Sequence, residues 1–159
     1  MTYFADLSEY AYGDLEFARP GTKNIGWLAS GRDFPTAQPS DELLELLWCF
    51  CSISVAKARG GHDCEFCPKG TAYFFGRSGR RLALSTAQIR VFGDNGTVYA
   101  APNLIYHYVL THHYRPPDEF IEALRNGPRP PNQDYFERLE RLGLKWSSTS
   151  TGEGARRLS

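Results

Sequence analysis

The chain has 159 residues, carries 18 basic and 18 acidic side chains, and has a formal net charge of zero at pH 7. A chain of this length can bury enough apolar surface to fold as one domain without disulfides or a metal. Its balanced charge provides no large positive field to hold a phosphate backbone, so we expect no nucleic acid partner.

The first residues, Met1 to Asp6, contain neither the basic nor the apolar stretch of a secretion signal. No apolar run has the length that a membrane-spanning helix needs. Without a secretion signal, a CxxC pair is more typical of metal or redox chemistry in a reducing compartment than of a disulfide. We therefore expect a cytoplasmic protein with reduced thiols and no membrane contact.

Residues 1–39 are rich in aromatic side chains and interrupted by glycine and proline, a pattern typical of irregular structure with short strands. The segment 24–28 is the candidate for one such strand.

A helix is predicted over residues 41–58. Ser40 can cap its first turn, and Asp41 and Glu42 favour the positive end of a helix. Apolar residues occupy nearly every face between Leu43 and Phe50, which predicts a buried central helix rather than a half-exposed one.

The spacing of apolar residues changes from helical to alternating after residue 70. Residues 71–75 and 81–84 flank one glycine-containing turn, and residues 88–92 and 97–100 flank another. Both patterns predict β-hairpins. We expect an antiparallel sheet of three or four strands.

The last third of the chain is predicted to be helical over 103–114, 118–125 and 133–142, because apolar residues recur there at helical spacing and proline or glycine follows each segment. The tail 147–159 has no periodicity and is expected to be disordered. The predicted fold is a single α+β domain over residues 1–146, with the antiparallel sheet packed on the buried central helix and three C-terminal helices.

The segment from Gly60 to Cys67 has the composition of a metal-binding loop. Cys64 and Cys67 have CxxC spacing, which lets two thiolates reach one zinc ion from a tight turn, and His62 precedes them after two flexible glycines. The alternative is that both cysteines pack as small apolar side chains. We predict a zinc site with His62, Cys64 and Cys67 as ligands.

The fourth ligand is expected from the helix over 103–114, which brings His107, His112 and His113. His107 lies in an apolar stretch where an imidazole needs a partner, so it is the predicted fourth ligand, with His112 as the second choice. The other interpretation of His113, and also of His112, is that they neutralise the C-terminal end of the helix.

The same residues leave an enzymatic alternative open. With water in the fourth position, the ion could activate that water for hydrolysis, in a pocket lined by His107, His112 and Tyr106 or Tyr108. The deaminase pattern, His-x-Glu followed by Pro-Cys-x-x-Cys, does not occur in the sequence.

The cysteines allow two further interpretations of the CxxC pair, and one cysteine pair can be excluded as a metal site. Cys64 and Cys67 could form a redox pair, although the proline that follows disfavours the helix such pairs usually begin, or they could release a metal on oxidation. Cys49 and Cys51 are two residues apart on the predicted helix and cannot hold one ion together, so we assign them to the core.

The chain resembles an uncharacterised family of bacterial domains that occur as small stand-alone proteins. The resemblance spans about residues 3 to 125 and implies that the His/Cys loop and the helix after Pro102 belong to one unit, but it implies no activity. The segments that carry it are Tyr3-Phe4-Ala5-Asp6-Leu7-Ser8, Gly61-His62-Asp63-Cys64-Glu65-Phe66-Cys67, Ala87-Gln88-Ile89-Arg90-Val91, Tyr99-Ala100-Ala101-Pro102 with His107-Tyr108-Val109, and Pro116-Pro117-Asp118-Glu119-Phe120-Ile121.

These observations favour a zinc-stabilised module that binds another protein, in a setting such as bacterial competition or immunity. A zinc-dependent, hydrolase-like enzyme with an open metal position is the alternative. The sequence identifies neither the partner nor the oligomeric state.

Overall fold

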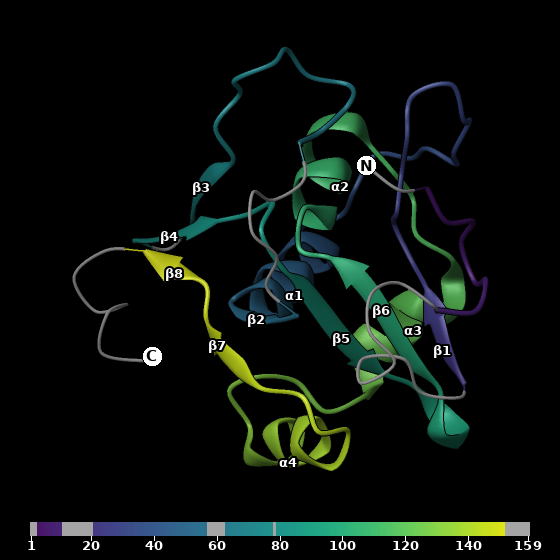
Figure 1. The fold of residues 1–159 in the computed structure, drawn as a ribbon, viewed down its shortest axis with the longest axis vertical. Helices are drawn as coiled ribbons and strands as arrows, with labels where there is room; N and C mark the ends of the chain where they lie inside the picture. The colour runs from purple at the N-terminus through teal and green to yellow at the C-terminus, as the bar shows by residue number, and fades with distance from the viewer. Residues whose placement is uncertain (1–2, 11–20, 57–62, 78, 152–159) are drawn as a thin grey trace.

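A computed structural model of the chain has an α+β fold, as the sequence predicts (Figure 1). It describes residues 3–10, 21–56, 63–77 and 79–151. Within these ranges the chain forms four helices, one sheet of five strands and one sheet of three strands.

The larger sheet has the strand order β1-β6-β5-β2-β7. Its strands are β1 (Thr22–Asn24), β2 (Ile53–Val55), β5 (Gln88–Phe92), β6 (Val98–Pro102) and β7 (Trp146–Ser148). Strands β5 and β6 form the predicted hairpin, and the turn between them contains Asn95 at a φ of 59°. Asparagine tolerates this left-handed conformation better than most residues.

The prediction of a purely antiparallel sheet is wrong, because β1 pairs with β6 in parallel. Hairpin patterns reveal only antiparallel partners that are close in sequence. More than 70 residues separate β1 from β6, so no turn signal connects them.

The first helix, α1 (Asp41–Cys51), is shorter than predicted. Its C-cap Ser52 donates its hydroxyl to the carbonyl of Cys49 at 2.6 Å, and β2 begins at Ile53. The β-branched residues of β2 pack in the sheet between β5 and β7, which outweighs continuation of the helix.

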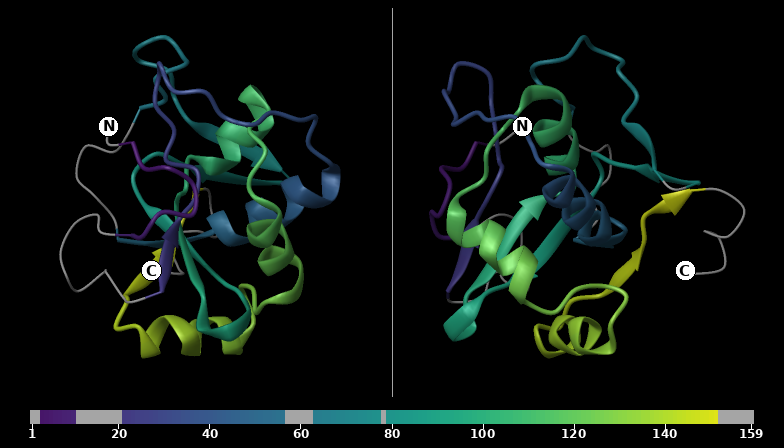
Figure 2. Two further views of the ribbon diagram at one scale, coloured as in Figure 1. Left: turned by 90° about the vertical axis from the view of Figure 1, so that its right-hand side faces the viewer. Right: turned by 180° about the vertical axis from the view of Figure 1, so that it is seen from behind.

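The other three helices match the predicted segments closely. They are α2 (Ile105–His112), α3 (Asp118–Asn126) and α4 (Gln133–Arg141). Figure 2 shows α1, α2 and α3 on one face of the larger sheet, whereas α4 lies at the end of the sheet near β7. Leu47, Phe50, Ile89 and Phe120 are among the residues of the fully buried core between these helices and the sheet.

The smaller sheet consists of β3 (Phe74–Arg77), β4 (Arg80–Ala83) and β8 (Ser150–Thr151). Strands β3 and β4 are the other predicted hairpin. Residues 147–148 and 150–151, which we expected to belong to a disordered tail, lie in β7 and β8, and the rest of the expected tail, 152–159, lies outside the described residues. Ordered pairing with β2 and β4 explains the difference.

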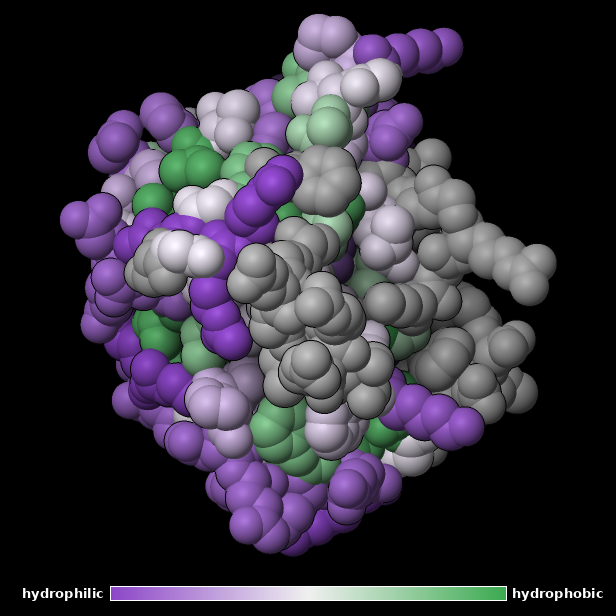
Figure 3. All heavy atoms as spheres, turned by 90° about the vertical axis from the view of Figure 1, so that its left-hand side faces the viewer, coloured by the Kyte–Doolittle hydropathy of each residue, from purple (hydrophilic) through white to green (hydrophobic). Residues whose placement is uncertain are grey.

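The molecular surface on the side of β3, β4 and β8 is a mosaic of hydrophilic side chains with hydrophobic patches between them (Figure 3). Among the residues that the structure describes, no helix combines the length and the apolar character needed to cross a bilayer.

Candidate metal centre

The CxxC loop lies between β2 and β3 and forms a tight turn around the sulfur of its first cysteine. The amide of Cys67 donates to the carbonyl of Cys64 at 3.3 Å, and the amide of Phe66 donates to the Cys64 sulfur at 3.4 Å. The amide of Cys64 itself donates to the hydroxyl of Tyr73 at 2.9 Å. These bonds direct the sulfur of Cys64 to the same side of the turn as that of Cys67.

Helix α2 brings two histidines to this turn. Nε2 of His107 lies 3.4 Å from the Cys67 sulfur, and Nε2 of His112 lies 3.4 Å from the sulfurs of both cysteines. The four ligand atoms of Cys64, Cys67, His107 and His112 all lie within 4.8 Å of one another. Four side chains from two separate segments thus converge on one point that could hold a metal ion.

The ring of His107 is held by packing. It lies against Tyr73 and Phe75, at centroid distances of 5.1 and 5.6 Å. Its Nδ1 atom is buried and has no hydrogen-bond partner among the described residues. Burial, with a smaller contribution from His112, lowers the pKa of His107 to about 4. The imidazole is therefore neutral at pH 7, the form that binds a metal.

His112 is the last residue of α2, where the helix ends in the left-handed conformation of His113. Its ring packs against Phe66 of the CxxC loop at 5.4 Å and against His107 at 5.0 Å. Burial also lowers the pKa of His112. Because the helix ends here, His112 can turn toward the loop while His113 caps the helix.

The thiol of Cys64 is only 3 % exposed, and this burial raises its pKa to about 11. Without a cation, the proton therefore stays on the sulfur. A divalent ion among the four side chains would replace that proton and supply the positive charge that the pocket lacks.

Glu65, the acid inside the CxxC loop, is held away from such chemistry by Ser30. The amide and hydroxyl of Ser30 donate to the same Glu65 oxygen at 2.9 and 3.0 Å. These hydrogen bonds lower the pKa of Glu65. The carboxylate thus holds the CxxC loop to Ser30.

A family model described as a domain of unknown function, DUF7919, matches residues 2–125. The chain belongs to the DUF7919 family. No curated protein and no solved structure matches the chain. The expected membership in an uncharacterised domain family is confirmed.

All four clustered residues lie inside the part of the chain that defines the DUF7919 match, whereas α4, β7 and β8 lie beyond it. The structure brings Cys64, Cys67 and His107 together as the sequence led us to expect. The predicted ligand His62 lies outside the described residues.

From the sequence, His112 ranked below His107 as the fourth ligand, and the two were not predicted to bind the same ion. They are five positions apart in the sequence, a spacing that puts side chains about 140° apart on a regular helix. The signal that could have identified the pair is the residue count: two cysteines and two histidines complete a tetrahedral set.

The remaining cysteines of this DUF7919 chain stay apart from the cluster. Cys51 is fully buried in the core, and Cys49 donates its thiol to the carbonyl of Pro130 at 2.7 Å. The assignment to the core therefore holds for Cys51, whereas Cys49 is half-buried.

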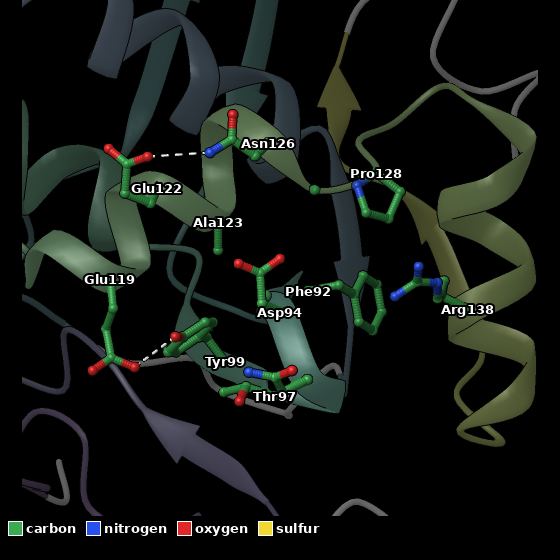
Figure 4. A pocket seen from close by; sticks show the side chains of 13 residues that line it. Phe92, Asp94, Thr97, Tyr99, Glu119, Glu122, Ala123, Asn126, Pro128 and Arg138 are labelled. Atoms are coloured by element: carbon green, nitrogen blue, oxygen red, sulfur yellow. Dashed lines mark hydrogen bonds between the residues drawn. The ribbon is translucent and has the colours of Figure 1, made fainter.

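A second concave site lies between the β5–β6 turn, α3 and α4, with a volume of about 480 Å³ (Figure 4). Two of its three acids are already engaged: Glu119 accepts from the hydroxyl of Tyr99 at 2.6 Å, and Glu122 accepts from the amide of Asn126 at 3.1 Å, while Asp94 also lines the site. This arrangement stabilises α3 and does not form a pair of free carboxylates for acid–base catalysis.

Proposed function

We propose that the protein binds one zinc ion through Cys64, Cys67, His107 and His112, and that the ion stabilises a cytoplasmic module that binds another protein. The observation that carries the metal assignment is the set of three sulfur–nitrogen distances of 3.4 Å between the cysteines and the histidines.

These distances match the edges of a zinc tetrahedron. Zinc–sulfur bonds of about 2.3 Å and zinc–nitrogen bonds of about 2.0–2.1 Å require sulfur and nitrogen atoms about 3.6 Å apart at tetrahedral angles. One central ion accounts for the approach of both histidines to the Cys67 sulfur. The geometry therefore favours a common central ion.

The ligand types favour zinc among the common metals. Two thiolates and two imidazoles suit zinc or another thiophilic ion, whereas calcium and magnesium prefer oxygen ligands. The thiols of the cluster are not in disulfides, which suits a reducing compartment such as the cytoplasm.

A structural role is favoured over catalysis because four protein side chains would fill the coordination sphere of the proposed ion. Catalytic zinc sites usually have three protein ligands and keep one position for water. The nearby carboxylate of Glu65 is bonded to Ser30 and is a poor candidate for a general base. The hydrolase alternative therefore loses support.

Metal content and cobalt substitution test the site. We expect one equivalent of zinc per chain and, after exchange, the visible spectrum of tetrahedral cobalt with sulfur ligands. Cys67→Ser and His112→Gln should each lower the zinc affinity by at least about tenfold, because each removes a ligand. Cys49→Ser and His113→Asn are matched controls that should retain both the metal and the spectrum.

The variant His62→Gln decides between the two ligand sets. Retention of zinc and an unchanged cobalt spectrum would support the four-residue cluster. Loss of zinc in His62→Gln but not in His112→Gln would show that His62 occupies the fourth position. Purified protein that binds no zinc, cobalt or copper at stoichiometric concentration would overturn the metal assignment.

The partner assignment is supported by the balanced charge of the chain, which does not favour polyanions, and by the closed metal site, which suits stabilisation of a binding surface. Affinity capture from the source cells, with wild-type protein and Cys67→Ser compared by mass spectrometry, tests it. One protein partner captured in stoichiometric amount by the zinc-loaded form and confirmed with purified components is expected. Turnover of a small-molecule substrate by the zinc form would instead favour the hydrolase alternative.

A further inference from the structure

An apolar groove of about 590 Å³ lies at the opposite end of α1 from its N-cap, and none of the four clustered residues lines it. It is formed where the end of α1, the start of β2, the connection between α3 and α4, α4 itself and β7 meet. Its main apolar walls are Trp48, Ile53, Pro130, Pro131, Phe136 and Trp146.

The groove is pre-formed by regular structure. The rings of Trp146 and Phe136 are in contact, with a centroid distance of 4.4 Å and a tilt of 40°, and β7 pairs with β2 through three consecutive residue pairs. Figure 1 shows α4 next to β7, which places these two aromatic side chains on neighbouring elements. The volume of this groove lies within the range of small-molecule sites, which commonly measure about 300–1,000 Å³.

The groove also exposes apolar surface that the fold leaves uncovered. Trp146 is 40 % exposed and is one of only two large hydrophobic side chains that are exposed within the described part of the chain. A bound apolar group would remove this ring from water.

The charge of the groove's lining indicates which class of ligand it suits. Arg80, at the start of β4, is the only charged residue that lines the groove among the described residues. None of the described acidic residues forms an ion pair with it. A guanidinium at the edge of an apolar cavity is suited to a carboxylate whose apolar part enters the cavity.

Covalent chemistry is not favoured in the groove. The thiol of Cys49 lines it, but burial raises the pKa of this thiol despite the opposing effect of Arg129, and the thiol donates to the carbonyl of Pro130. Cys49 is therefore a protonated part of the wall and not a nucleophile.

We propose that this groove binds a small amphipathic carboxylate, with the apolar body against Trp146, Phe136 and Trp48 and the carboxylate paired with Arg80. This site is independent of the metal cluster and of the proposed zinc.

Titration of the full-length protein with decanoate, below its micelle concentration, tests the proposal. Tryptophan fluorescence should change saturably, and calorimetry should give one site per chain. Arg80→Gln should weaken decanoate binding by about threefold to tenfold, because it removes an exposed charged partner. The same variant should leave the affinity for neutral decanol unchanged.

Arg141→Gln is the matched control, because Arg141 is exposed on α4 and does not line the groove. It should bind decanoate as the wild type does. Equal decanoate affinity in the wild type and Arg80→Gln would overturn the anion assignment, and the absence of saturable binding would overturn the site. Sedimentation that shows a dimer dissociated by Trp146→Ala would assign the groove to a second copy of the chain instead.

Discussion

Tyr73 links the CxxC loop to the histidines of the cluster. Its hydroxyl accepts the hydrogen bond of the Cys64 amide, and its ring packs edge-on against His107. One side chain therefore positions a thiol and an imidazole that come from different segments. It acts on the proposed ion only through these two ligands.

Replacement of Tyr73 by Phe should separate these two contributions. The variant keeps the ring but leaves the buried Cys64 amide without its acceptor, which should cost about 1–2 kcal/mol of unfolding free energy. Urea denaturation measures this loss. Zinc affinity, measured by chelator competition, should fall about threefold or more. Tyr3→Phe is the control, and an unchanged zinc affinity in Tyr73→Phe would show that the turn positions Cys64 without this bond.

Gly127 follows α3 at a point where two backbones touch. A Cβ atom added there would lie 2.2 Å from the carbonyl oxygen of Phe92 and 2.9 Å from that of Ala123. Neither atom belongs to a side chain that can rotate away. Glycine is thus required at this position because there is no room for a Cβ atom, and not because of its backbone angles.

Gly127→Ala should therefore destabilise the protein by about 3 kcal/mol, because β5 and α3 must move apart. Thermal unfolding measures the effect. Gly76→Ala is the matched control, since its added Cβ would be no closer than 3.6 Å to any neighbour. Similar melting temperatures for the two variants would contradict the close approach at Gly127.

The candidate site illustrates what single residues reveal before a structure is known. Cys64 and Cys67 follow from their spacing, and His107 from the polarity of an imidazole in an apolar stretch. His112 could not be paired with His107 by helical spacing, because its approach depends on the end of α2. The turn of the chain at His113 is a tertiary feature that no local pattern encodes.

At the scale of elements, the start of α1 is controlled by its N-cap. The hydroxyl of Ser40 accepts from the amide of Leu43 at 3.1 Å, and Asp41 and Glu42 occupy the first turn. This is the arrangement that the sequence predicts. It determines where the buried helix enters the core.

Ser40→Ala should cost about 1 kcal/mol of stability, because the amide of Leu43 loses its acceptor. Urea unfolding gives the value, and Ser40→Asp should restore most of it. Ser147→Ala, in strand β7, is the comparison. Equal stability of Ser40→Ala and the wild type would mean that tertiary packing alone positions α1.

The helices and hairpins could be predicted because the residue patterns that indicate them are local in the sequence. Strand pairing between distant segments could not be predicted, because no local pattern indicates it. The two hairpins and the three later helices match the structure within a few residues. The end of α1 was missed because pairing of β2 with β5 and β7 overrides the helical pattern after Ser52. The parallel pairing of β1 with β6 has no sequence signal.

For the whole molecule, the proposed ion would add stability to a fold whose hydrophobic core is already large. The buried cluster extends over α1, α2, α3 and both faces of the β5–β6 hairpin region, so the fold does not depend on metal alone. Zinc binding should raise stability by mass action, by about 2.7 kcal/mol when free zinc is about 100 times the dissociation constant.

A chelator should consequently lower the melting temperature by about 5–10 °C while leaving the far-ultraviolet circular dichroism spectrum unchanged. Readdition of zinc should restore the melting temperature. The variant Cys67→Ser, which lacks one ligand and binds zinc more weakly, should show a smaller response to both treatments. Complete unfolding on chelation would instead show that the core is insufficient without the ion.

The separation of the clustered residues along the chain has a consequence for synthesis. Cys67 and His107 are 40 residues apart, and Cys64 and His112 are 48 apart. A ribosome therefore releases the two thiols well before either imidazole is available. If the proposed ion binds these four side chains, its full coordination must wait until α2 has emerged and docked, and metal loading would then report the completion of the tertiary fold.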